Sequence, residues 1–162
     1  MRVILDTNIL CSALITPDGP SDRLYRAWRE GRFELLTSDE QLEEFRRVTR
    51  YPRVRQYIEP SAAGAMCNEL RELATVVGPL PLVEGSRDPA DNFLLSMAQA
   101  GKADFLVTGD KHDLLSVGVF EQTRIISAQQ LLEEIKPRHK KGPKSKAKAR
   151  KRRGCAAAPK LS

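Results

Sequence analysis

Short aliphatic runs alternate along the chain with longer segments of helical period, and this alternation most restricts the possible folds. It is typical of an α/β domain in which helices cover both faces of a mostly parallel sheet. The predicted strands are residues 3–5, 33–36, 75–77, 105–107 and 124–126. The predicted helices are residues 22–30, 39–49, 61–73, 90–100 and 128–135. The sequence therefore predicts a three-layer α/β/α sandwich.

Serine residues precede several of these helices. Ser21 precedes the first predicted helix, Ser38 the second, Pro60-Ser61 the third and Ser127 the last. A serine hydroxyl accepts a hydrogen bond from the free backbone amides of a first helical turn. We expect these serines to act as helix caps.

The charge divides the chain into two parts. Residues 137–162 contain 11 Lys or Arg and no Asp or Glu. Removing these 11 from the 27 bases of the chain leaves 16, against all 21 acids, so residues 1–136 carry a net charge of −5. We expect one folded domain over residues 1–136 and a disordered basic tail over 137–162, because the tail has too few apolar residues to form a core.

Cysteine usage and apolar run length indicate where the protein acts. The longest apolar runs have the length of strands, and the N-terminus has no signal-peptide pattern. Three cysteines without a metal-binding spacing favour a reducing, cytoplasmic setting, with Cys11 and Cys67 as core residues. We therefore expect a cytoplasmic protein with no membrane segment.

Acidic side chains follow two of the predicted strands. Asp6 ends the first strand, and Asp110 follows the fourth. Ligands of open parallel sheets bind at the carboxyl ends of the strands, where the loops diverge. Two further acidic pairs lie in or just before helices: Glu43 with Glu44, and Asp88 with Asp91. The pattern predicts several carboxylates at one edge of the sheet.

Clustered carboxylates repel one another unless a cation lies among them. Mg²⁺ or Mn²⁺ suits oxygen ligands, whereas the scarcity of His and Cys argues against zinc. One or two such ions can activate a water and neutralise the charge of a phosphodiester. The acids therefore indicate a metal-dependent hydrolase.

Four blocks of the sequence carry a family resemblance: VILDTNILCSAL, LLTSDEQLEEFRRVTRYPRV, SRDPADNFLLSMAQAGKADFLVTGDKHDLL and TRIISAQQLL. With them the chain resembles PIN-domain ribonucleases, and especially the VapC-like toxins of bacterial toxin–antitoxin systems. The resemblance covers nearly all of residues 1–135 and none of the tail. It implies a Mg²⁺- or Mn²⁺-dependent endoribonuclease, an antitoxin protein as partner, and a homodimer.

The same resemblance implies the site residues. The catalytic, metal-binding acids would be Asp6, Glu44, Asp91 and Asp110. Asn8, Asp88, Thr108 and Asp113 are possible accessory residues. Family members commonly have GDKDLL where this chain has GDKHDLL, so the inserted His112 leaves the role of Asp113 open.

Several of these residues have a structural alternative. Asp6 could cap a helix that starts at Thr7, and Asp88 before Pro89 could cap the next helix. Asn8 and Thr108 could orient Asp6 or simply close turns. Asp91 is predicted one turn inside its helix, where a cap role is excluded.

Adjacent helical residues point about 100° apart, so only one of Glu43 and Glu44 can enter the site. Spacing does not choose between them, and the resemblance favours Glu44. The nearby arginines are either a solvated helix face or a surface for RNA phosphates: Arg46, Arg47, Arg50, Arg53 and Arg55. The basic tail is either a second phosphate-binding arm or a solubility tail.

Two other functions compete with a ribonuclease. A phosphatase that uses Asp6 as nucleophile would need a second Asp two residues later, and this chain has Asn8 there. A non-catalytic or housekeeping RNA-binding protein of the same family would keep the fold without toxin activity. All four implied acids are present, which favours an active nuclease.

Overall fold

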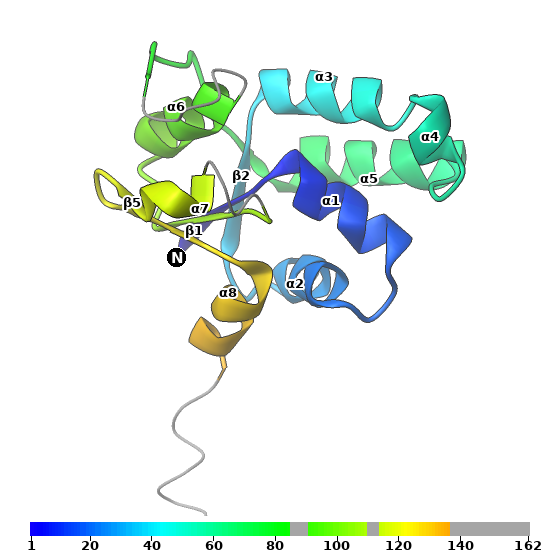
Figure 1. Cartoon of the computed structure of the whole chain (residues 1–162), viewed down its shortest axis with the longest axis horizontal. Helices are drawn as coiled ribbons and strands as arrows, with labels where there is room; N and C mark the ends of the chain where they lie inside the picture. The colour runs from blue at the N-terminus through cyan, green and yellow to red at the C-terminus, as the bar shows by residue number, and fades with distance from the viewer. Residues whose placement is uncertain (85–90, 110–113, 137–162) are drawn as a thin grey trace, which may run out of the picture.

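A computed structural model describes residues 1–84, 91–109 and 114–136, and its six strands form one sheet (Figure 1). The strands are β1 (Arg2–Leu5), β2 (Glu34–Thr37), β3 (Thr75–Val76), β4 (Phe105–Val107), β5 (Val119–Phe120) and β6 (Thr123–Ile126). The helices are α1 (Thr7–Ile15), α2 (Pro20–Arg29), α3 (Asp39–Val48), α4 (Pro52–Arg55), α5 (Pro60–Leu73), α6 (Asn92–Gly101), α7 (Leu114–Val117) and α8 (Ala128–Glu134). The predicted basic tail, residues 137–162, lies outside the described residues.

The sheet has the strand order β3-β2-β1-β4-β6-β5. Neighbouring strands run parallel, except that β5 and β6 form an antiparallel pair. From β1 the chain builds outward through β2 and β3 on one side, and it later adds β4 and β6 on the other. The direction of growth therefore reverses between β1 and β4, and such a switch point is where ligands of open α/β sheets bind.

Alternating side chains of each strand enter two separate cores. In β1, Val3 and Leu5 join the core under α1, α2, α3, α5 and α8, whereas Ile4 joins the core under α6 and α7. This follows from the two-residue period of a strand that is covered on both faces. Figure 1 shows α1, α3 and α5 on one side of the sheet and α6 and α7 on the other. The predicted three-layer sandwich is confirmed.

Helix starts agree with the sequence in part. Ser38 accepts a hydrogen bond from the backbone N–H of Gln41, and Ser127 forms a reciprocal capping box with Gln130, as predicted. The cap assigned to Ser21 is wrong, because α2 begins at Pro20 after Gly19 and Ser21 is buried inside its first turn. Proline at a first helical position needs no amide partner, so Pro20 starts α2 two residues before the predicted start at Asp22. The cap expected of Ser61 is wrong for the same reason, because α5 begins at Pro60.

Four short elements were not among the predictions: α1, α4, α7 and β5. Helix α1 buries Thr7, Ile9, Leu10, Cys11 and Ala13 and has only Asn8 and Ser12 as more exposed polar residues, so its sequence shows no clear helical period. Helices α4 and α7 are single turns, and β5 has two residues. Cys11 and Cys67 are buried free thiols, which agrees with their expected place in the core.

No helix in the described ranges is both long and apolar enough to cross a membrane.

Candidate active site

Asp6 stands where β1 ends and α1 begins, beside the switch point. Its backbone N–H donates to the Val107 carbonyl of β4 at 2.9 Å, which continues the strand pairing by one residue. Its own carbonyl accepts from Ile9 at 2.8 Å, and its Oδ1 accepts from the Asn8 backbone N–H at 3.4 Å. Asp6 therefore does cap α1, yet only 6% of the residue is exposed.

The far oxygen of this carboxylate is held by the end of the neighbouring strand. The Thr108 hydroxyl, directly after β4, donates to Asp6 Oδ2 at 2.7 Å. Thr108 is fully buried, whereas the Asn8 side chain is exposed and only its backbone amide contacts Asp6. Of the two residues considered for orienting Asp6, the structure places the Thr108 side chain and the Asn8 backbone against it.

Glu44 reaches the same region from α3. The buried Thr7 hydroxyl, next to Asp6 in the chain, donates to Glu44 Oε1. The side chain of Glu43 is 71% exposed and pairs with Arg46 at 3.0 Å. The packing of α3 thus brings Glu44, and not Glu43, beside Asp6.

The electrostatics of the site follow from burial. Burial raises the pKa of Asp6, hydrogen bonds from Thr108 and the Asn8 amide partly offset this, and the nearby Glu44 raises the pKa further. Burial, with Glu44 and Asp6 as added negative charges, also raises the pKa of the Cys11 thiol to about 11. The site is therefore a region of negative potential.

No lysine or arginine in the described part of the chain forms an ion pair with Asp6 or Glu44. A buried carboxylate without a balancing charge is costly. A hard divalent cation with oxygen ligands would supply that charge, and Asp6 and Glu44 offer oxygen ligands of the required kind. The residues that the structure brings together fit Mg²⁺ or Mn²⁺.

A buried glutamine holds α3 in this position. Gln41 Nε2 donates to the Leu5 carbonyl at 2.7 Å, and Gln41 Oε1 accepts from the Thr37 hydroxyl at 2.7 Å. Gln41 is 1% exposed and lies three residues before Glu44, on the adjoining helical position. It thereby ties the helix that carries Glu44 to the last residue of the strand before Asp6.

We expect Gln41→Leu to lower the free energy of unfolding by about 2–4 kcal/mol, because the buried Thr37 hydroxyl loses its acceptor and the Leu5 carbonyl loses a donor. Chemical denaturation would measure the loss. Gln129→Leu, the same change at an exposed position of α8, should cost under about 0.5 kcal/mol. Equal losses for the two variants would contradict a structural role for Gln41.

Sequence reasoning missed Thr7 and Gln41. Gln41 had a usable signal, since it is a polar residue on the apolar side of a helix, three residues before Glu44. Thr7 had none beyond its position next to Asp6.

Asp91 lies at the start of α6, and its predicted place inside that helix is wrong. The helix begins at Asn92, so Asp91 occupies the N-cap position, although its side chain makes no capping hydrogen bond. The residue is half-buried, and its Oδ2 is shielded from solvent.

Of the three implied acids within the described ranges, the structure brings Asp6 and Glu44 together. Within the described ranges no group of three or more His, Cys, Asp or Glu side chains gathers closely enough to hold a metal ion. Asp88, Asp110 and Asp113 lie outside those ranges. The shared cluster is therefore Asp6 with Glu44, supported by Thr7, Thr108 and Gln41.

Residues 2–112 match the family model of the PIN domain. The chain belongs to the PIN-domain family. The matched range contains Asp6, Glu44, Asp91 and Asp110. PIN domains are generally nucleases that use divalent metal ions, which places this chain among hydrolases acting on nucleic acid.

The chain is also similar to an uncharacterized protein of Methanocaldococcus jannaschii. The two sequences are 28% identical over 118 residues, which cover 72% of this chain and 75% of the relative. The match to the PIN domain does not by itself assign a toxin role.

Proposed function

We propose that the protein is a Mg²⁺- or Mn²⁺-dependent endoribonuclease that cuts RNA phosphodiesters. Its active site would lie at the carboxyl ends of β1 and β4. One observation carries the proposal: buried Asp6 lies at the switch point of a PIN-domain sheet, beside Glu44 and without a balancing base. A site of this kind is poised for a cation and for the phosphate that the cation would attract.

Asp6 and Glu44 would hold one or two cations, with Asp91 and Asp110 completing the set by family resemblance. When bound, the cation supplies activation of the attacking water and neutralisation of phosphate charge. The chain fixes the ligands: Thr108 orients the Asp6 carboxylate, and Thr7 orients Glu44. Asp88 and Asp113 are accessory acids in the same proposal, and Asn8 contributes its backbone amide to Asp6.

Arg46 and Arg47 of α3 and Arg50 just beyond its end would bind RNA phosphates. The basic tail would add sequence-independent contacts, because each neutralised phosphate releases counterions. The arginines and the basic tail would offset the repulsion between RNA and the net negative charge of residues 1–136.

The resemblance to VapC-like toxins supports a narrower role: a cytoplasmic toxin that forms a homodimer and is held inactive by an antitoxin protein. A small neighbouring reading frame with a DNA-binding pattern would favour this role. A housekeeping ribonuclease would have no such neighbour.

The test is incubation of the full chain with a 5′-labelled single-stranded RNA in Mn²⁺ or Mg²⁺, with and without chelator. We expect internal cuts that need the ion and leave a new 5′ phosphate on each downstream product. Product ends can be read by ligation or phosphatase sensitivity. Cleavage that persists in chelator, or RNA binding without any cleavage in either ion, would overturn the proposal.

A further inference from the structure

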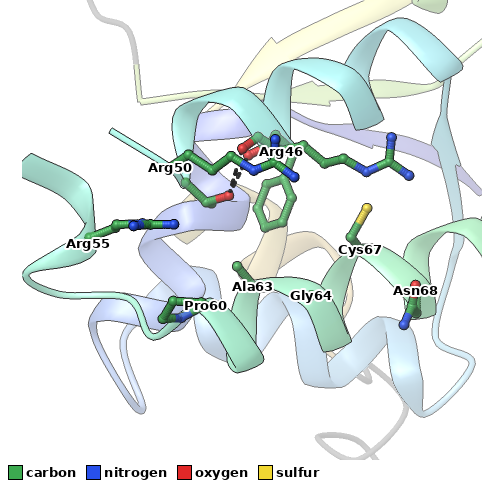
Figure 2. A pocket seen from close by; sticks show the side chains of 10 residues that line it. Arg46, Arg50, Arg55, Pro60, Ala63, Gly64, Cys67 and Asn68 are labelled. Atoms are coloured by element: carbon green, nitrogen blue, oxygen red, sulfur yellow. Dashed lines mark hydrogen bonds between the residues drawn. The ribbon is translucent and has the colours of Figure 1, made fainter. Parts of the chain in front are cut away.

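A pocket of about 360 Å³ lies between α3, α4 and α5 (Figure 2). Arg46 of α3, Arg50 just beyond the end of α3 and Arg55 of α4 line it together with Gly64 and Asn68 of α5. Figure 2 shows Arg46 and Arg50 across the pocket from α5, with Arg55 at one end. None of the catalytic candidates within the described ranges lines this pocket.

The pocket carries an excess of positive charge. Among the described residues no Asp or Glu lines it, and Arg50 and Arg55 form no ion pair there. Arg46 pairs with Glu43 at 3.0 Å, outside the pocket wall. Guanidinium groups present flat pairs of donors that match phosphate oxygens, so the pocket suits a phosphate group.

A second hollow, of about 540 Å³, adjoins this pocket. It is lined by Glu43, Arg46, Arg47, Arg50 and Tyr51, so the pocket and the hollow share Arg46 and Arg50. Arg47 follows Glu44 by three residues, and residues at that spacing are neighbours on a helix surface. The arginines of the pocket and the hollow therefore form a basic surface that extends along α3 to Arg47, one helical turn from Glu44.

Two exposed tyrosines flank α4 in the sequence, and one of them, Tyr51, lines the second hollow. Tyr51 is 41% exposed and Tyr57 is 63% exposed. Exposed rings near a basic groove are the usual stacking platforms for unpaired bases, and each stacked base contributes about 1–3 kcal/mol. An acidic polypeptide would use the arginines but would have less need of the rings.

We propose that the pocket lined by Arg46, Arg50 and Arg55 is a phosphate-binding subsite for single-stranded RNA, with Tyr51 and Tyr57 as base-stacking residues. The subsite holds the strand away from the acids and directs it around α3 toward Glu44. The assignment of RNA as ligand rests on the proposed function. The subsite itself rests on the pocket and its charge, and on Tyr51 in the neighbouring hollow.

Gly64 provides the sharpest test. It lies inside α5, and a Cβ added there would meet no heavy atom within 4 Å. Glu and Gln are both better helix formers than Gly, so either replacement should leave the fold intact. Gly64→Glu adds a carboxylate to the pocket, and Gly64→Gln adds a neutral side chain of the same size.

The measurement is fluorescence anisotropy of a labelled single-stranded RNA in chelator at several salt concentrations. We expect Gly64→Glu to weaken binding about tenfold and to reduce the salt dependence by about one phosphate contact, while Gly64→Gln stays within about threefold of wild type. Equal Kd values for all three proteins would overturn the proposal. Equal losses in both variants with an unchanged salt slope would overturn it too, because charge would then play no part.

A second pair of variants separates the pocket from general charge. Arg53 and Arg55 both lie on exposed α4, but only Arg55 lines the pocket. Arg55→Ala should weaken RNA binding several-fold more than Arg53→Ala. Equal effects would mean that the arginines act only as diffuse charge, and the subsite would be wrong.

Competition distinguishes RNA from an acidic partner, and the chelator separates binding from cleavage. Unlabelled single-stranded RNA should displace the probe far better than a poly-glutamate peptide of equal charge; the reverse order would overturn the assignment of RNA.

Pocket-dependent binding without cleavage in Mn²⁺ would refute the proposed nuclease and keep the subsite. Normal cleavage and binding by Gly64→Glu would refute the subsite and keep the nuclease.

Discussion

Asp6→Asn is expected to reduce metal-dependent RNA cleavage by about three orders of magnitude. The carboxylate lies at the centre of the site, between the amide of Asn8 and the hydroxyl of Thr108. A metal ligand and its charge are worth several kcal/mol of transition-state stabilisation, and each 1.4 kcal/mol is about a tenfold change in rate. Initial rates with labelled RNA under saturating Mn²⁺ would measure the loss.

The same variant should remain folded. An asparagine keeps an acceptor for the Asn8 amide, and its NH₂ group can donate to the Thr108 hydroxyl, which reverses that hydrogen bond. Burial raises the pKa of Asp6 in the folded protein. At pH values between the ordinary carboxyl pKa and this raised pKa, the folded wild type therefore binds more protons than the unfolded chain. Wild type without metal therefore loses stability over that window, and Asp6→Asn does not.

Thermal unfolding in chelator across a pH series would show this. We expect Asp6→Asn to be the more stable protein at neutral pH, with the difference vanishing at acidic pH. Mn²⁺ should raise the Tm of wild type more than that of the variant. Asp104→Asn, at the opposite end of β4, is the control, because this exposed residue accepts from the Arg2 amide and lies far from the site. Full activity in Asp6→Asn, or equal loss in Asp104→Asn, would contradict the assignment.

Glu44→Gln should lower cleavage by about a hundredfold or more, while Glu43→Gln should stay within about threefold of wild type. The two residues are adjacent, but Glu44 accepts from buried Thr7, whereas Glu43 is exposed and pairs with Arg46. A glutamine at position 44 can still accept from Thr7, so the loss would report charge and not a broken contact.

Titration calorimetry with Mn²⁺ provides a measurement apart from turnover. We expect weaker ion binding in Glu44→Gln and unchanged binding in Glu43→Gln. Equal losses in the two variants, or the reverse order, would remove Glu44 from the site. Circular dichroism of both proteins would exclude a folding defect as the cause.

The sheet was the most predictable part of this protein. Buried parallel strands are short, continuous aliphatic runs, and runs such as residues 3–5 and 105–107 are bounded by polar or glycine residues. The same reasoning failed where local signals are weak. Helix α1 has few polar residues and no clear apolar stripe, and Asp91 is the N-cap residue of α6 although the sequence predicts it inside the helix.

By itself the sequence determined the α/β class, the position of Asp6 at the end of a buried strand and its likeness to PIN-domain nucleases. Only the tertiary structure decided which partners that carboxylate has. The rotation of α3 depends on how Gln41, Leu42 and Phe45 pack against β1 and α5, and this rotation brings Glu44 to Thr7 and turns Glu43 to solvent. Helical period marks an apolar face, but the contacts at the edges of that face depend on residues distant in sequence.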